Sequence, residues 1–431
     1  MGGKQVKDMV IVGFALFAMF FGAGNLIFPP YLGVLSGVQW WIAFVAFFIA
    51  DGGLALLGVI AMIKYDGKAD EMLARCGKKL GAIIGTAIVL CIGPGIAIPR
   101  TAATTYEIGI LPNFGQNINP WIFSIIFFAI VIFLSIKPSK VVDIVGSYLT
   151  PALLIALAVL IIKGIISPLG EIRQNSLIEA PFAEGISQGY QTMDALAAVI
   201  FASVIIISII AKGYKTNEEK FKMTIGAGVV ASIGLALVYG GLAYLGATVS
   251  NQYGAEVQQT ALVVAITNAL LGSGGKMLLG LIVALACLTT AIGLSSAAGN
   301  YFSDLSKGKL KYEHVVIVVC VFSAIVSNFG VSTIIQVAAP ILSLVYPATV
   351  TMIILSLFTD KIKNDNVYKF GVYFALIVSI LSIISGYSWG SWAGFINKLP
   401  LTSLGFNWVV PVIIGCLLGA FVPSSMKPVT E

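Results

Sequence analysis

Three short polar runs interrupt apolar stretches of the sequence, and their residues suit the binding of a small charged ligand. The first run, residues 20–30, reads Phe-Phe-Gly-Ala-Gly-Asn-Leu-Ile-Phe-Pro-Pro. Two glycines and an asparagine weaken helix propensity in the middle of this stretch. A helix break there would free carbonyls that can bind a cation and N–H groups, at Gly24 and Asn25, that can hold a carboxylate. The same small residues also permit close helix packing, so the residues alone leave two interpretations open.

The second and third runs place a carboxylate and two hydroxyls inside apolar segments. Residues 189–195 read Gly-Tyr-Gln-Thr-Met-Asp-Ala. A carboxylate such as Asp194 is costly in an apolar segment and is usually functional there, although it can also cap a helix start. Residues 286–293 read Ala-Cys-Leu-Thr-Thr-Ala-Ile-Gly. The hydroxyls of Thr289 and Thr290 suit a hard cation such as sodium, but helical threonines also bond the preceding turn of their own helix.

Two more charged residues, Asp51 and Arg100, lie within apolar segments. At 1.5 Å of rise per residue, both fall about 15–18 Å from the outer end of their segments. This similar depth predicts that they pair or share a polar network, which would lower the cost of burying each. Gly93-Pro94-Gly95, just before Arg100, predicts a kink. Asp143 and His314 lie at the ends of apolar segments and are expected to be interfacial.

Enzyme chemistry finds little support in the residue types. The single histidine, His314, leaves a serine-type hydrolase without a base inside the apolar region, and no HExxH motif occurs. A two-aspartate mechanism built from Asp51 and Asp194 is the one hydrolase chemistry that the residues leave as an alternative. The five cysteines form no CxxC pair, and four of them lie in apolar runs, which argues against disulfides and zinc.

The overall composition identifies lipid as the solvent for much of the surface. Of 431 residues, 58% are hydrophobic and 10% are charged, and the mean hydropathy is +0.99. A soluble domain has about 45–50% apolar and about a quarter charged residues. The composition therefore excludes a single soluble domain, a secreted disulfide scaffold and a disordered chain, and it predicts an all-α integral membrane protein.

Apolar stretches long enough to cross about 30 Å of hydrocarbon recur along the whole chain. The stretches at 8–35, 80–110 and 273–302 are too long for straight crossings. Residues 167–186 are expected to form an outer polar loop, and 249–272 a loop with a short surface helix. The stretches predict about 12 transmembrane helices, at 8–35, 39–63, 80–110, 119–136, 140–166, 187–212, 221–248, 273–302, 313–329, 331–357, 367–387 and 406–424.

The basic residues predict the orientation of these spans. If the N-terminus is inside, most of the 25 Lys and Arg residues fall on the cytoplasmic side. Only Lys163, Arg173, Lys276 and Lys398 fall on the opposite side, and Arg100 lies within a span. Both termini are therefore expected in the cytoplasm. This asymmetry accounts for the net charge of +6, and nothing supports nucleic-acid binding.

The three polar runs resemble those of the branched-chain amino acid:cation symporters, the bacterial branched-chain amino acid transport system II carriers. The residues that carry the resemblance are Phe21 to Pro30, Gly189 to Asp194 and Cys287 to Gly293, and the likeness extends from the first span to the twelfth. The resemblance implies a protein of the bacterial cytoplasmic membrane. It also implies membership of the amino acid–polyamine–organocation superfamily, with a LeuT-type fold.

A LeuT-type fold implies a particular division of the chain. Two inverted repeats of five helices would occupy residues 1–166 and 167–360, and two peripheral transmembrane helices would occupy 361–431. The sequence is compatible with this division, because 8–166 and 187–357 have similar lengths and each opens with a span that polar residues interrupt.

The resemblance also implies a binding site near the middle of the membrane. The substrate carboxylate would meet the first N–H groups after the break in the first span. Its ammonium group would meet carbonyls at that break and near Asp194, and its side chain would pack against spans 3, 6 and 8. The expected substrate-binding residues are Phe20, Phe21, Gly22, Ala23, Gly24, Asn25, Ile98, Tyr190, Met193, Asp194 and Phe201. The expected sodium ligands are the carbonyls of Ala18, Phe21 and Ala286 and the hydroxyls of Thr289 and Thr290.

The implied function is uptake of leucine, isoleucine and valine by alternating access, coupled to sodium. Some proton-coupled relatives with this fold place a lysine from the fifth span where sodium would sit. Residues 146–151 of this chain contain no lysine, which favours sodium, and Asp194 is the candidate carrier if H+ is used instead. The expected partners are the amino acid and membrane lipid, with no obligate protein partner evident. A channel is disfavoured because no repeated pore filter occurs, and an enzyme is not expected.

Overall fold

The computed structural model describes residues 3–136, 150–386 and 388–423. Every regular element in these ranges is a helix, which confirms the fold class expected from composition. Helices suit a bilayer because they satisfy their backbone N–H and C=O groups internally. Large apolar side chains such as Phe133, 78% exposed, and Leu237, 71% exposed, lie on the outer surface. Such a surface suits contact with lipid rather than water.

The helices before residue 167 build the first half of the molecule. Short π-helical segments, Ile49–Gly53, Cys91–Gly95 and Thr105–Ile110, connect some of them end to end. The helices are α1 (Gly3–Phe20), α2 (Ala23–Ser36), α3 (Trp40–Phe48), α4 (Leu54–Ile63), α5 (Ala69–Ala74), α6 (Lys78–Leu90), α7 (Ala97–Thr104), α8 (Leu111–Phe114), α9 (Pro120–Ser135) and α11 (Thr150–Ile166).

The remaining helices follow an irregular segment that ends at Ala180. Helix α15 is the longest of them and contains a non-helical residue, Gly272. The helices are α12 (Pro181–Thr192), α13 (Asp194–Ala211), α14 (Asn217–Thr248), α15 (Gln259–Leu305), α16 (Tyr312–Val326), α17 (Val331–Leu357), α18 (Asp365–Ser385) and α19 (Val409–Phe421).

Apart from the start of the sixth span, the predicted spans overlap these helices wherever the chain is described. Among the described residues, eight helical segments are long and apolar enough to cross a membrane, and three shorter apolar helices add to them. The span expected at 140–166 is described only from Thr150, and Asp143 lies outside the described residues. His314 is exposed in the first turn of α16, which confirms its place at a helix end. The surface helix expected within 249–272 is the part of α15 before Gly272.

The predicted start of the sixth span is wrong. Helix α12 begins at Pro181 rather than near residue 187, so the polar loop expected over residues 167–186 ends at Ala180. Proline suits the first position of a helix because its fixed φ is already helical and it lacks an N–H that would go unpaired. Glu184 lies in the first turn of α12, where the helix dipole favours a negative charge.

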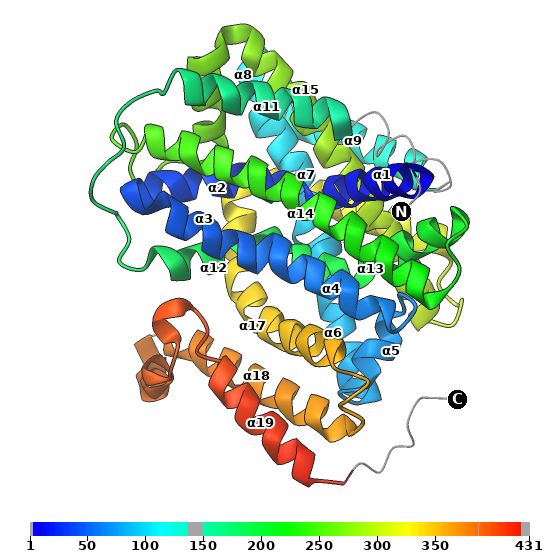
Figure 1. The fold of residues 1–431 in the computed structure, drawn as a ribbon. Coiled ribbons are helices and arrows are strands. Elements are labelled where there is room, and N and C mark those ends of the chain that lie inside the picture. The colour runs from blue at the N-terminus through cyan, green and yellow to red at the C-terminus, as the bar shows by residue number, and fades with distance from the viewer. Residues whose placement is uncertain (1–2, 137–149, 387, 424–431) are drawn as a thin grey trace.

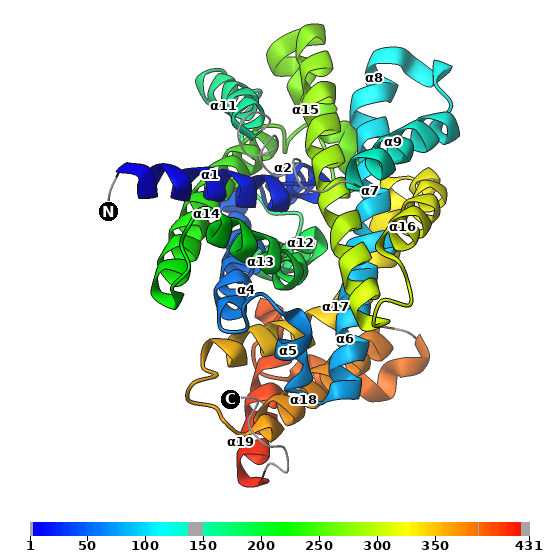
Figure 2. The same ribbon diagram turned by 90° about the vertical axis from the view of Figure 1, so that its right-hand side faces the viewer.

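The helices form two groups, and the two broken spans belong to the first of them (Figures 1 and 2). In the first group, α14 packs along α1 and α2, α3 packs on α12, and α4 packs on α13. In the second group, α15 packs against α7, α9 and α16. Both views show α18 and α19 at one edge of the molecule, and there α18 packs between α17 and α19.

Local sequence explains how several of these helices start. Asn119 caps α9 by accepting a hydrogen bond from the Trp121 N–H at 2.8 Å. Thr216 and Glu219 form a reciprocal capping box at the start of α14, with the Glu219 N–H donating to the Thr216 hydroxyl at 3.2 Å. Hydrogen bonds from the Thr216 backbone N–H and hydroxyl lower the pKa of Glu219. The start of α14 is therefore polar and exposed.

Candidate functional site

The first span is broken between α1 and α2, as its glycines predict. Phe21 and Gly22 lie outside both helices, and Gly22 is extended, with φ −114° and ψ −161°. The Asn25 side chain accepts a hydrogen bond from the Gly22 N–H at 3.1 Å. Helix α2 starts at Ala23, so the N–H groups of Gly24 and Asn25 belong to its first turn, which has no acceptor within the helix. The expected location of free N–H groups is confirmed.

The second broken span lies between α12 and α13. Met193 is the single residue between them and has a left-handed conformation, with φ 69° and ψ 14°. The Met193 N–H donates to the Tyr190 carbonyl at 3.2 Å, and its carbonyl accepts from the Ala197 N–H at 2.9 Å. A left-handed methionine is uncommon. The break near Asp194 that the resemblance implied is therefore confirmed, although no glycine or proline marks it.

Asn25 links the two breaks directly. Its Nδ2 donates to the Asp194 carboxylate at 2.9 Å and to the Tyr239 hydroxyl, on α14, at 2.5 Å. Both hydrogens of the amide are thereby used. Asn25 and Asp194 are 1% and 4% exposed. Because each lies at the start of the second half of a broken span, this hydrogen bond fixes the two half-helices relative to each other.

Asp51 and Arg100 meet the second break from opposite sides. Thr192, the last residue of α12, donates its hydroxyl to Asp51 Oδ1 at 2.6 Å. Arg100 Nη1 donates to the Gln191 carbonyl at 2.7 Å, and Nη2 lies 3.5 Å from the Thr192 carbonyl. Asp51 and Arg100 were predicted to pair or to share a polar network. The shared network is confirmed, because Thr192 contacts both residues. The kink expected at Gly93 is also present, since Gly93 is non-helical.

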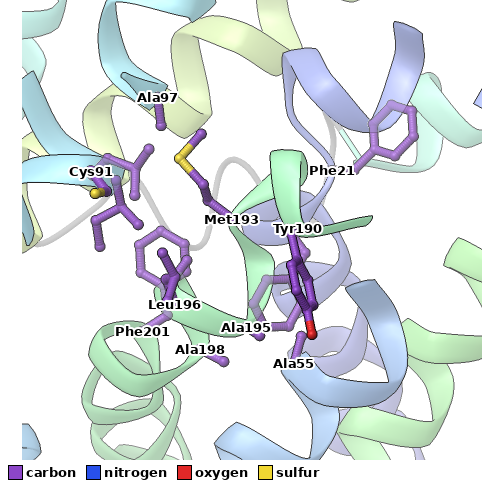
Figure 3. Close-up of a cluster of buried hydrophobic side chains, with 14 of the residues drawn as sticks. Phe21, Ala55, Cys91, Ala97, Tyr190, Met193, Ala195, Leu196, Ala198 and Phe201 are labelled. Carbon is purple, nitrogen blue, oxygen red and sulfur yellow. The ribbon is translucent and has the colours of Figure 1, made fainter. Parts of the chain in front are cut away.

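A small cavity lies where the two breaks meet. Its volume is about 20 Å³, which is room for about one water molecule. Figure 3 shows Met193 at the turn into α13, with its side chain directed toward Ala97. The residues that line the cavity are Met19, Phe20, Gly22, Ala23, Asn25, Ile92, Ala97, Arg100, Thr101, Thr192, Met193, Asp194, Ala197, Phe201, Thr290 and Leu294.

Four expected substrate-binding residues lie outside this wall. Ile98 is fully buried on another face of α7, because Ala97 and Thr101 occupy the face toward the cavity. Tyr190 instead stacks on Tyr346, with ring centroids 4.2 Å apart. The remaining two are Phe21, whose ring stacks on Phe17 with centroids 5.3 Å apart, and Gly24, which packs against Arg100.

The expected sodium ligands are divided between two cavities. Ala18, Ala286 and Thr289 line a second cavity of about 110 Å³, between α1, α11 and α15. The Thr289 hydroxyl donates to the Ala286 carbonyl at 2.9 Å, which is the local structural role open to any helical threonine. Thr290 lines the first cavity, and its buried hydroxyl has no hydrogen-bond partner. Phe21 lines neither cavity.

Thr290 nonetheless fits a cation ligand. A Cβ placed on Gly22 would lie 3.5 Å from the Thr290 hydroxyl oxygen, so α15 presents this hydroxyl to the break after α1. An unpaired buried hydroxyl is costly, and a cation would provide its missing partner. The oxygens that α1 and α15 supply here are neutral, and the Asp194 carboxylate lies in the same cavity wall. Among the described residues, no group of three or more His, Cys, Asp or Glu side chains forms a metal site.

Sequence reasoning missed two members of this region. Tyr239 lies in the apolar α14 as an isolated polar group, which is a weak signal in a sequence rich in tyrosine. Arg100 was noted as a buried charge, but its contact with the end of α12 was not expected. That contact depends on how α7 and α12, which are far apart in the sequence, meet. Neither residue could be assigned a role from local spacing.

In the described part of the chain, all regular elements are helices and two broken spans meet at a buried polar cavity, which is the arrangement of the LeuT-type fold. Two solved structures share this fold. The nucleobase-cation-symport-1 family transporter Mhp1 in a closed conformation has a TM-score of 0.64 at 15% identity, over 95% of this chain and 91% of that one. A substrate-bound, outward-open Na+-coupled sialic acid symporter has a TM-score of 0.64 at 14% identity, over 98% and 91%.

The chain belongs to the family of branched-chain amino acid transport proteins, whose model matches residues 5–426. It is 40% identical to the branched-chain amino acid permease BraB of Bacillus subtilis (strain 168), over 96% of this chain and 95% of that protein. It is 38% identical to a putative branched-chain amino acid carrier protein of Staphylococcus aureus (strain USA300), over 96% and 97%. The protein is therefore a transporter and not an enzyme, so the two-aspartate hydrolase is excluded.

Proposed function

We propose that the protein takes up leucine, isoleucine and valine together with sodium, by alternating access. The observation that carries this proposal is the junction of two broken helices, joined by the Asn25–Asp194 hydrogen bond at a buried cavity. Broken helices place positive and negative dipole ends in the middle of a membrane, where they can hold the two charges of an amino acid. The names of the relatives support branched-chain amino acids as the substrate.

The two charged groups of the substrate meet opposite ends of the broken helices in this proposal. The carboxylate binds the N–H groups in the first turn of α2, at Gly24 and Asn25. The ammonium group binds the Asp194 carboxylate and the last carbonyls of α1, at Phe20 and Phe21. The carbonyls of Gln191 and Thr192 contribute less, because Arg100 already donates to them.

The aliphatic side chain of the substrate lies against the apolar part of the cavity wall. Ile92, Ala97, Phe201 and Leu294 supply this surface. Because the cavity has a volume of about 20 Å³, a leucine enters only if the surrounding helices separate. Alternating access provides this separation, by moving the helices around the breaks relative to α7 and α15.

Sodium suits the ion site because the available ligands are neutral oxygens from α1 and α15. One charge falling through 100 mV releases about 2.3 kcal/mol, and a tenfold sodium gradient adds about 1.4 kcal/mol. A single sodium ion could then support accumulation on the order of several hundred-fold. The basic residues favour both termini in the cytoplasm of a bacterial cell, with two five-helix repeats at 1–166 and 167–360 and a peripheral part at 361–431.

Transport into proteoliposomes tests this proposal. Sodium and proton gradients are imposed separately, and uptake of labelled leucine is measured with and without excess isoleucine, valine, alanine or lysine. We expect a sodium gradient to drive uptake that isoleucine and valine compete. Uptake driven by a proton gradient alone would identify H+ as the coupling ion, with Asp194 as the candidate carrier. Failure to bind or transport leucine would overturn the proposed function.

A further inference from the structure

Arg100 is a buried cation on the wall of the cavity. Its side chain is 3% exposed, and its Nε is buried without a hydrogen-bond partner. The guanidinium group packs on the first turn of α2, since a Cβ placed on Gly24 would lie 2.9 Å from Arg100 Nη2. The same guanidinium lies 5.5 Å from the centre of the Phe28 ring. Arg100 and the positive end of the α2 dipole therefore adjoin the same space.

No carboxylate of the described residues forms an ion pair with Arg100 within 4.0 Å, and Asp194, in the same cavity wall, interacts with its charge only from a greater distance. The ion pairs with an N–O distance of 4.0 Å or less all lie elsewhere, and none of them includes Arg100. The protein acceptors of Arg100 are instead the Gln191 and Thr192 carbonyls. A charge buried within a membrane protein is costly unless it is paired. The positive helix end and a buried guanidinium without a carboxylate in direct contact together favour an anionic group of the substrate as its close partner.

We propose that Arg100 binds the α-carboxylate of the transported amino acid, together with the first N–H groups of α2. This inference rests on the proposed function and names the group that selects its substrate class. Guanidinium and carboxylate groups form short, charge-assisted hydrogen bonds. Asp194 lines the same cavity and binds the ammonium group. The site then binds zwitterionic amino acids more tightly than amides, esters and amines that lack a free carboxylate.

A purely structural role for Arg100 leads to a different expectation. Its bonds to the last carbonyls of α12 also stabilise the negative end of that helix dipole. Loss of this contribution alone would lower the affinity for every ligand of the cavity by the same factor. Loss of a carboxylate partner would weaken only those ligands that carry a carboxylate.

Ligand binding to the purified full-length protein separates these roles. The ligands are leucine, leucinamide, which lacks the carboxylate, and 4-methylpentanoate, which lacks the ammonium group. Arg100→Gln is compared with wild type, and Arg75→Gln is the matched control. Arg75 is a half-buried arginine that bonds Asp365 at 2.7 Å and lies outside the cavity.

For Arg100→Gln we expect leucine affinity to fall about 10- to 100-fold, the usual range for a lost hydrogen bond to a charged group. Leucinamide affinity should change by less than about threefold, and Arg75→Gln should leave the ratio of the two affinities unchanged. If Arg100→Gln does not fold, Arg100→Lys serves instead. Lysine keeps the positive charge but lacks the planar guanidinium that binds a carboxylate through two hydrogen bonds. The affinity for leucine should therefore still fall more than the affinity for leucinamide.

Equal weakening of leucine and leucinamide, or unchanged leucine affinity, would overturn the assignment of Arg100. Either result would leave the proposed function in place, because wild type would still bind leucine. Wild-type protein that binds no leucine would instead overturn the proposed function, and the role of Arg100 with it.

Discussion

The two broken spans differ both in backbone geometry and in cause. Between α1 and α2 the chain opens at Gly22, and the helix that follows begins with unpaired N–H groups. Between α12 and α13 the chain turns at Met193, a residue that rarely adopts the left-handed conformation. The first break follows from local composition. The second break is held by side chains of other helices. Arg100 donates to a carbonyl at the end of α12, and Asp51 accepts from the Thr192 hydroxyl there.

This difference suggests a division of labour between the breaks. The first presents bare main-chain groups to the cavity, whereas the second has most of its polar groups occupied by side chains of the protein. The first break is therefore suited to contact the ligands, and the second to transmit their binding to the surrounding helices. Asn25 contributes to both breaks, because its side chain accepts from the Gly22 N–H at the first and donates to Asp194 at the second.

The largest effect is expected from Asn25→Ala. The change removes three hydrogen bonds at once, to Asp194, to the Tyr239 hydroxyl and from the Gly22 N–H. A lost hydrogen bond to a charged group costs about 1.5–3 kcal/mol, so initial rates of leucine uptake should fall more than about 100-fold. Asn328→Ala, which removes two bonds of a half-buried asparagine in the segment after α16, is the control. Equal losses in both variants would contradict a special link between the breaks.

A smaller effect is expected within the first break, where two glycines differ in the space around them. A Cβ on Gly24 would lie 2.8 Å from a Phe28 ring carbon and 2.9 Å from Arg100 Nη2, closer than real contacts allow. A Cβ on Gly22 would meet Thr290 at 3.4 Å, an ordinary contact, and its extended backbone suits any residue. Gly24→Ala should therefore reduce leucine affinity about tenfold, and Gly22→Ala clearly less. Leucine binding by calorimetry measures both, and the reverse order would show that the first turn of α2 is not the contact surface.

The same contrast explains how much the sequence could predict. Glycine, asparagine and apolar run lengths are local signals, so the first break, the kink at Gly93 and the helix positions could be expected. The left-handed Met193 could not, because its conformation depends on Arg100 and Asp51, which are remote in sequence. Rotation about a helix axis is equally hard to predict. Ile98 was expected on the cavity wall, but its neighbour Ala97 lies there instead.

The sodium dependence of uptake tests the roles of Thr289 and Thr290 at the ion site. Thr289→Ala and Thr290→Ala should each raise the sodium concentration that gives half-maximal leucine uptake, by about fivefold to tenfold for one lost oxygen ligand. Thr349→Ala, in α17, is the control, because this buried threonine only bonds the Val345 carbonyl of its own helix. Unchanged sodium dependence in both α15 variants would remove the threonine pair from the ion site. A change in Thr290→Ala alone would place the ion in the first cavity.

The smallest effect concerns the backbone of the second break. Met193→Ala and Met193→Gly both remove the atoms beyond Cβ of a residue that is 1% exposed, so their losses of packing differ only by the Cβ. They differ in the left-handed conformation, which costs a residue with a Cβ about 1–2 kcal/mol and glycine very little. Met193→Gly should therefore be more stable than Met193→Ala by about 1 kcal/mol, seen as a higher midpoint of thermal unfolding in detergent. At Ala197, one turn into α13, glycine should instead destabilise relative to the native alanine, because the backbone there is helical. If Met193→Gly unfolds at the lower temperature, the turn is not left-handed in the membrane, and the second break is held by side-chain packing rather than by the polar network at the end of α12.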